Sequence, residues 1–230
     1  MTAAMIEGAQ ITALVLAGGR GVRMGGADKG LQPFRGQPLV RAVLERLTAQ
    51  TLRPTYIAIN ANRNADRYAA IGAAFSAPVW PDDALAPPDN RSCEFSGPLA
   101  GMLAGLKHAT TPYLLTVPCD APLLPLSLCR RLAQALQNDP DADLAVAHGP
   151  GGETEPAQIQ PMFCLLRRDA RQRLAQDLSA WLGAGQRKAR AWIARQRHAV
   201  AHFAAPADDP RAFANANTPE QLRRLEDKAC

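Results

Sequence analysis

The chain has 230 residues, of which 47% are hydrophobic and 20% charged, and its formal net charge is +5. This length suits one α/β domain with a full hydrophobic core, and the composition excludes collagenous, coiled-coil and disordered classes. No apolar run reaches the ~18 residues of a membrane span, and residues 1–10 lack the features of a secretion signal. Five widely spaced cysteines without metal-ligand spacing suit a reducing compartment, so we expect a cytoplasmic protein.

Strands and helices alternate along the chain. Residues 11–17 form a short apolar run that ends at two glycines, which is typical of a strand buried on both faces of a parallel sheet. After a glycine-rich loop, Pro38 opens a helix with apolar residues at i, i+3 and i+4. The pattern predicts further strands at 55–60, 78–80, 113–117, 143–147, 158–166 and 199–203, helices at 63–72 and 126–137, a loop at 81–96 and turns at 148–152 and 215–219.

This alternation predicts the architecture. Strand–helix–strand units from residue 11 to about 147 imply right-handed crossovers. We therefore expect an α/β fold: a single three-layer domain, 11–230, with a mostly parallel, Rossmann-like sheet. Residues 1–10 are expected to form a flexible tail.

Ligands of such sheets bind outside the carboxyl ends of the strands, and the first strand ends in an unusual loop. Residues 16–30 contain six glycines and three cations. Glycines let backbone N–H groups approach phosphate oxygens, and Arg23 and Lys29 can neutralise charge there. The loop is no Walker A motif, because no Ser or Thr follows Lys29, and Met24 breaks the dinucleotide fingerprint. We interpret it as a nucleotide-phosphate loop; the alternative is a flexible loop with incidental charges.

A second strand ends in a carboxylate between prolines. Asp120 lies between Pro118 and Pro122, whose rings fix the local backbone. One carboxylate is enough for Mg²⁺ when substrate phosphates and water supply the other ligands. The alternative is an N-cap or turn role. Cys119 has no histidine partner in either motif, which disfavours a Cys/His nucleophile.

A third feature is a helix start with glycines on one face. Gly97, Gly101 and Gly105 recur every four residues. Each interior glycine costs ~1 kcal/mol relative to alanine, so a ligand or another backbone should approach closely. Tight packing of the helix on the sheet is the alternative, above all for Gly105.

Residues 167–197 carry nine Arg/Lys and two Asp, a net charge of +7. The segment suits an anionic substrate or an acidic partner; the alternative is the solvated faces of Arg-rich helices. No aromatic residues interleave in the way that single-stranded nucleic acid requires, so we expect no nucleic-acid partner.

Five motifs occur in a fixed order over residues 11–225. They are Leu16-Ala-Gly-Gly with Arg23-Met-Gly-Gly-x-Asp-Lys29, Asn60-Ala-Asn62-Arg63, Gly97-Pro-Leu-Ala-Gly101, Pro118-Cys-Asp120-x-Pro122 and Asn215-Ala-Asn217-Thr-Pro219. Their combination and order resemble molybdenum cofactor guanylyltransferase, the MobA-like nucleotidyltransferases, whose fold is that of the nucleotide-diphospho-sugar transferases. The resemblance implies transfer of GMP from GTP to the phosphate of molybdenum-bound molybdopterin, with release of pyrophosphate.

The resemblance also implies roles for residues. Lys29, Arg23 and Asp120 would be catalytic, with Asp120 on Mg²⁺. The tandem Asp82-Asp83 leaves open which aspartate is the ligand. The nucleotide would be bound by Leu16, Ala17, Gly18, Gly19, Lys29, Asn60, Asp82 and Asp120. The pterin or its phosphate would be bound by Gly26, Gly97, Gly101, Asn215 and Asn217.

The implied partners are GTP and molybdenum-molybdopterin, together with cofactor biosynthesis proteins and molybdoenzyme chaperones. We expect no association with a membrane. The nucleotide-binding half would be about 11–125 and the pterin-side half about 126–230. Because the attacking group is itself an anionic phosphate, no protein nucleophile is required. Two alternatives stay open: a cytidylyltransferase acting on the same pterin, although the resemblance associates Leu-Ala-Gly-Gly with guanine, and a non-enzymatic GTP-binding carrier of the cofactor.

Overall fold

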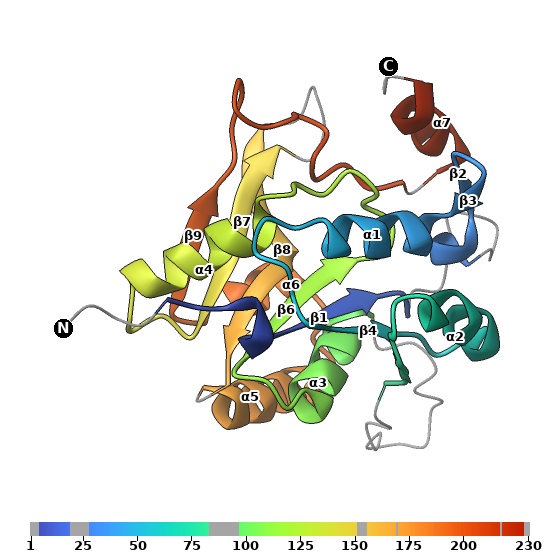
Figure 1. Ribbon diagram of the computed structural model, residues 1–230. Coiled ribbons are helices and arrows are strands. Elements are labelled where there is room, and N and C mark those ends of the chain that lie inside the picture. Colours follow the sequence, from blue (N-terminus) through green and yellow to red (C-terminus); the bar gives the residue numbers. More distant parts are fainter. Residues whose placement is uncertain are drawn as a thin grey trace.

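A seven-stranded sheet in the order β5-β4-β1-β6-β8-β7-β9 forms the centre of the molecule (Figure 1). The computed structural model describes residues 5–18, 28–82, 97–150, 156–168, 170–216 and 218–227. The strands of the sheet are β1 (Ile11–Leu16), β4 (Tyr56–Asn60), β5 (Val79–Trp80), β6 (Tyr113–Pro118), β7 (Leu144–Pro150), β8 (Ala157–Arg167) and β9 (His198–His202).

The sheet is mostly parallel, as predicted. β1 pairs in parallel with β4 and β6, β4 with β5, and β7 with β9. Only β8 runs against its neighbours, since its pairs with β6 and β7 are both antiparallel. The beginning of β8 therefore lies beside the carboxyl ends of β6 and β7.

Helices cover both faces of the sheet. Successive side chains of β1 point to opposite faces, so Ala13 and Val15 belong to one core cluster and Leu14 and Leu16 to the other. The first cluster includes residues of α1 (Leu39–Thr48), α2 (Ala65–Ala73) and α4 (Leu128–Asn138). The second includes residues of α3 (Pro98–His108), α5 (Arg171–Gly183) and α6 (Ala189–Ile193). This confirms the three-layer α/β prediction.

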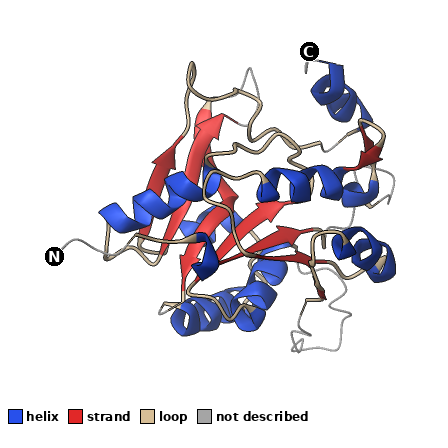
Figure 2. Cartoon of the chain, viewed as in Figure 1, coloured by secondary structure: helices blue, strands red, loops and turns tan. Residues whose placement is uncertain are grey.

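A small hairpin and the last helix lie beside α1 (Figure 2). The hairpin joins β2 (Pro33–Phe34) to β3 (Gln37–Pro38), and the helix is α7 (Pro219–Asp227). Phe34 and Leu39 pack with Leu222 and Leu225 in a third buried cluster. The sequence analysis did not predict this hairpin, because strands of two residues carry no periodicity.

The structure differs from the sequence-based predictions at the turn 148–152 and in the N-terminal segment 1–10. The turn predicted at 148–152 is wrong at its start: β7 continues through Pro150, because Gly149 pairs with Gln158 and Pro150 with Ala157. Residues 151 and 152 lie outside the described ranges. Part of the segment expected to be a flexible tail is packed on the domain. Ile6 is buried, and residues 8–10 form a 3₁₀ turn. Thr55 N donates a hydrogen bond to Gly8 O at 3.0 Å. None of the described helices is long and apolar enough to cross a bilayer.

Candidate active site

The carboxyl ends of three neighbouring strands bring separate sequence motifs together. Past the end of β1, Ala17 N donates to Asn60 O of β4 at 2.8 Å. On the other side, Cys119 N donates to Leu16 O at 3.1 Å. The ends of β1, β4 and β6 are thus joined edge to edge, as the parallel topology predicts.

A pocket of about 280 Å³ opens at these strand ends. Among the lining residues that the structure describes, Lys29 is the one cation and Asp120 the one carboxylate. Four consecutive residues of β8, 160–163, form part of the wall. The lining residues are Leu16, Ala17, Gly18, Lys29, Pro98, Pro118, Cys119, Asp120, Gln160, Pro161, Met162, Phe163 and Asn215.

Lys29 and Asp120 form an ion pair in this pocket. Lys29 Nζ lies 3.2 Å from Asp120 Oδ2, and the two side chains are 24% and 11% exposed. The backbone of Asp120 is held in turn, because Ala216 N donates to Asp120 O at 2.9 Å. The end of the glycine-rich loop therefore contacts the strand-end carboxylate, which is joined in turn to the C-terminal asparagine motif.

Asn215 lines the pocket and carries an unpaired acceptor. Its Oδ1 is buried without a hydrogen-bond partner in the described structure. Buried polar groups are nearly always paired, so an unpaired oxygen on a pocket-lining residue suits a donor from a ligand. Gln160, on β8, is buried at the same pocket and donates through Nε2 to Gly149 O at 2.9 Å.

The pocket residues of β8 are placed by an irregularity. Val146 pairs with Cys164, but the next residue of β7, Ala147, pairs with Gln160. Three residues of β8, 161–163, therefore have no partner on β7, and they line the pocket. The sequence signal is Pro161, which has no backbone N–H to donate and interrupts the strand predicted at 158–166.

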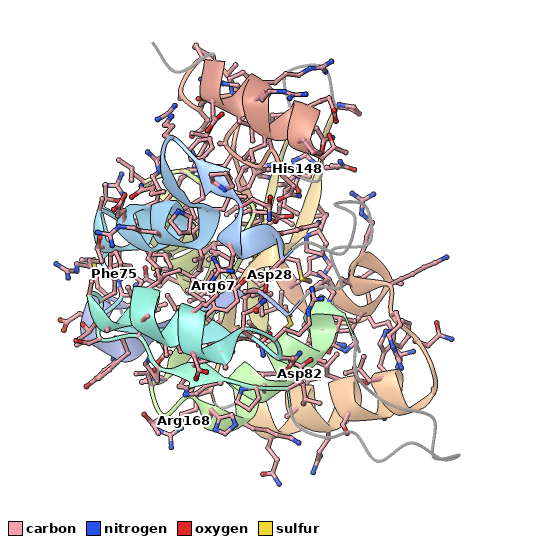
Figure 3. All side chains as sticks on the ribbon, turned by 90° about the vertical axis from the view of Figure 1, so that its right-hand side faces the viewer. Asp28, Arg67, Phe75, Asp82, His148 and Arg168 are labelled. Atoms are coloured by element: carbon pink, nitrogen blue, oxygen red, sulfur yellow. The ribbon has the colours of Figure 1, made fainter. Side chains whose placement is uncertain are left out.

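Asp82, which is labelled in Figure 3, follows β5 by two residues and is hydrogen-bonded to two asparagines. Asn60 Nδ2 donates to one carboxylate oxygen at 2.8 Å and Asn62 Nδ2 to the other at 2.7 Å. Asn62 Oδ1 in turn accepts from Asp82 N at 2.7 Å. Asn60 and Asp82, which the family resemblance placed together, are in contact, and Asn62 joins them.

Glycine is required at positions 97, 101 and 105 for different structural reasons. A Cβ on Gly101 would lie 2.1 Å from Asn60 Oδ1, and one on Gly105 would lie 2.4 Å from Leu14 Cδ2. Glycine at both positions therefore allows the helix to pack closely on the sheet. Gly101 packs against Asn60, a residue predicted to bind the nucleotide. Gly97 has open space around it but a φ of +77°, which glycine adopts without strain.

A network that the sequence analysis missed lies beside Lys29. Asp28 accepts a hydrogen bond from the Tyr68 hydroxyl and another from Asn64 Nδ2, at 3.0 Å for the latter. These contacts join residues that are 36 and 40 positions apart. The available signal was an aspartate directly before the predicted phosphate-binding lysine.

Cys119 lines the pocket, but its thiol is buried and unsuited to nucleophilic attack. Burial, reinforced by the neighbouring Asp120 and Asp28 charges, raises its pKa well above the usual range. None of the four histidines is among the described lining residues. Both observations agree with a mechanism that needs no Cys/His pair.

Several cations of the 167–197 segment have structural partners. Arg167 donates to Leu136 O and to Ala142 O, and Arg187 donates to Leu182 O at 2.7 Å. No cation of the segment is among the pocket-lining residues that the structure describes. The segment's charge is thus used, at these positions, to hold carbonyl groups rather than a pocket ligand.

Some predicted site residues lie outside the described residues. They are Gly19, Arg23, Gly26, Asp83 and Asn217.

Comparison with known proteins decides the family. The family model of the MobA-like NTP transferase domain matches residues 13–200. The chain belongs to this family. It is therefore a nucleotidyltransferase, as the motifs predicted.

Relatives agree over nearly full length. A protein from Albidiferax ferrireducens named molybdenum cofactor guanylyltransferase is 47% identical, over 96% of this chain and 98% of the relative. One of the same name from Bordetella petrii is 45% identical, over 96% and 100%.

Solved structures share the fold. The molybdopterin-guanine dinucleotide biosynthesis protein A from Archaeoglobus fulgidus matches with a TM-score of 0.67 at 19% identity, covering 94% of this chain and 96% of the other. CMP:2-keto-3-deoxy-manno-octonic acid synthetase, solved with CTP, matches with a TM-score of 0.65 at 14% identity, covering 95% and 96%.

Proposed function

We propose that this nucleotidyltransferase transfers GMP from GTP to the phosphate of molybdenum-bound molybdopterin, releasing pyrophosphate. The observation that carries the proposal is the Lys29–Asp120 pair, which places a cation and a carboxylate 3.2 Å apart in a pocket at the strand ends. Relatives that are 44–47% identical and named molybdenum cofactor guanylyltransferase support this choice of substrates.

Transfer of a nucleotidyl group requires that the two substrates be positioned and that the charge on their phosphates be neutralised. The attacking pterin phosphate is already anionic, so the protein need not supply a nucleophile. Lys29 is suited to stabilise the charge on the transferred and departing phosphates in a partly enclosed site. The raised pKa of Cys119 is consistent with a reaction in which the substrate, and not the protein, supplies the nucleophile.

Asp120 is the residue that would hold Mg²⁺. A single buried carboxylate fits this ion, which binds proteins through one or two carboxylates and keeps its other positions for phosphates and water. No group of three or more His, Cys, Asp or Glu side chains in the described part of the chain forms a separate metal site. When bound, Mg²⁺ would neutralise phosphate charge, while Lys29 and the loop amides orient the nucleotide.

The two substrates would meet across the pocket. Leu16, Ala17 and Asp120 belong to the proposed nucleotide half, about 11–125, and the unpaired Oδ1 of Asn215 belongs to the proposed pterin half, about 126–230. Pterin rings carry N–H donors that suit such an acceptor. Guanine offers N1–H and an amine as neighbouring donors, which the carboxylate of Asp82 and backbone carbonyls near Ala17 are suited to accept.

The test is pyrophosphate release with molybdenum-loaded molybdopterin and each of the four nucleoside triphosphates. A buried polar group left unpaired costs ~1 to 3 kcal/mol, so kcat/KM for GTP should exceed that for CTP by at least ~10-fold. A preference for CTP would establish the cytidylyltransferase alternative instead. Binding of GTP without any pyrophosphate release would establish a carrier.

We further propose that the enzyme works in the cytoplasm. There it would receive its pterin from cofactor biosynthesis proteins and pass the product to molybdoenzyme chaperones.

A further inference from the structure

The segment from the last residue of β4 into the first half of α2, residues 60–68, contacts both described ends of the glycine-rich loop. At the first end, a Cβ on Gly18 would lie 3.0 Å from Asn62 Nδ2 and 3.2 Å from Asn60 Oδ1. At the second end, Asp28 bonds to Asn64 and Tyr68. One short segment thus sets the separation of the two points between which the loop runs.

The contact at Asp28 is built from a buried phenol and an amide. Tyr68 is 0% exposed, and its hydroxyl donates to Asp28 Oδ1. Asn64 Nδ2 donates to Oδ2 of the same carboxylate at 3.0 Å. Burial raises the pKa of Tyr68 far above its usual value, so the hydroxyl stays a donor at every pH used for enzyme assays.

The residue after Lys29 is held by the same tyrosine. A Cβ on Gly30 would lie 2.5 Å from the Tyr68 hydroxyl oxygen, so only glycine fits there without displacement. Lys29 begins a 3₁₀ turn, Lys29–Leu31, in which Leu31 N and Gln32 Nε2 donate to Asp28 O at 3.3 and 3.0 Å. Both neighbours of Lys29 are therefore fixed against α2, and its side chain is directed to Asp120.

We propose that Tyr68, assisted by Asn64, is a positioning residue for nucleotidyl transfer: it clamps Asp28 and Gly30 and so holds Lys29 in register with the pocket. The inference rests on the proposed function, in which Lys29 stabilises charge on the transferred phosphate. Tyr68 itself is absent from the pocket lining that the structure describes, so its effect passes through Lys29.

The main test is Tyr68→Phe, which removes the hydroxyl and keeps the ring in the core. We expect kcat for pyrophosphate release to fall ~10-fold or more, because small displacements of a catalytic group are costly, while KM for GTP changes less than ~2-fold. Tyr56→Phe is the matched control, since Tyr56 is 57% exposed at the start of β4, the end remote from the pocket, and should leave kcat unchanged.

A second variant guards against misfolding of the first. Asn64 is exposed, has a φ of +52° and makes no side-chain cap bond to α2, so Asn64→Gly removes the amide donor without backbone strain. It should lower kcat in the same direction as Tyr68→Phe, by a smaller factor, with the melting temperature kept.

A double-mutant cycle separates positioning from stability. In a Lys29→Ala background, adding Tyr68→Phe should lower kcat no further, because the group that it positions is gone. Multiplicative losses, an unchanged kcat in Tyr68→Phe, or a loss expressed only in KM would overturn the inference. If Lys29→Ala alone keeps the wild-type rate, the proposed role of Lys29 fails instead, and the two failures are thereby distinguished.

Discussion

Replacing Gly101 by alanine should disturb the nucleotide side of the site through a single methyl group. The new Cβ would lie 2.1 Å from Asn60 Oδ1, 2.7 Å from Asn60 Cγ and 3.0 Å from Leu16 Cδ2. Atoms cannot approach so closely, and Gly101 lies within α3, so the carboxamide of Asn60 has to rotate or shift. Asn60 is 1% exposed, and it then leaves its bonds to Trp80 O (3.0 Å) and Asp82 Oδ1 (2.8 Å).

The magnitude follows from opposing terms. Leaving a buried polar group unpaired costs ~1 to 3 kcal/mol. Alanine returns up to ~1 kcal/mol through its helix propensity. The free energy of unfolding should fall by ~1 kcal/mol, which lowers the melting temperature by about 2–4 °C in a domain of this size. Affinity for GTP should fall by ~10-fold or more, because Asn60 and Asp82 lose their arrangement together.

Two glycines supply controls in the same assays, thermal unfolding and GTP titration by calorimetry. Gly105→Ala brings a Cβ within 2.4 Å of Leu14 Cδ2, so it should lower stability while leaving GTP affinity unchanged. Gly183→Ala, with open space around the Cβ, should not lower either quantity. Wild-type GTP affinity in Gly101→Ala would refute the placement of Asn60 in the nucleotide site.

Three further predictions concern charged groups. Lys29→Ala should lower kcat by at least ~10-fold, equivalent to ~1.4 kcal/mol of transition-state stabilisation, measured by pyrophosphate release; a smaller loss would contradict its proposed role. Asp120→Asn should abolish transfer while the melting temperature stays near the wild-type value, and a Mg²⁺ titration showing wild-type turnover at ordinary concentrations would remove it from the metal site. Burial acts to raise the pKa of Asp143, but hydrogen bonds from Arg197 and Arg173 outweigh it and hold the pKa below its usual value; the carboxylate therefore stabilises the fold above its unfolded pKa of ~3.9 and loses this effect as the pH falls through its folded pKa. Urea unfolding should show Asp143→Asn less stable than the wild type at neutral pH and equally stable in strong acid, and a pH-independent difference would contradict the assignment.

The features that sequence reasoning predicted have local causes. The apolar run at 11–17 has to be buried, and a parallel sheet sends whatever follows such strands to one edge. The sequence pattern alone could thus assign Asp120 and the glycine-rich loop to one site. In the structure, Lys29 and Asp120 are in contact at this edge of the sheet.

The features that it missed depend on relations between distant segments. Nothing near Tyr68 in the sequence indicates that its hydroxyl meets Asp28, because the contact follows from how α2 packs on β4. The turn at 148–152 was placed too early for a similar reason. Gly149 is held in the sheet by its pairing with Gln158, a residue across the hairpin.

The pocket is closed by parts of the chain that are far apart in order of synthesis. Leu16 and Lys29 leave the ribosome before Asn215, and the backbone bond from Ala216 N to Asp120 O joins the late segment to the pocket. A chain that is still being made therefore has its glycine-rich loop long before it has every residue that lines the pocket. Since a ligand stabilises only the state that binds it, nucleotide and pterin together would favour the finished fold over every shorter intermediate.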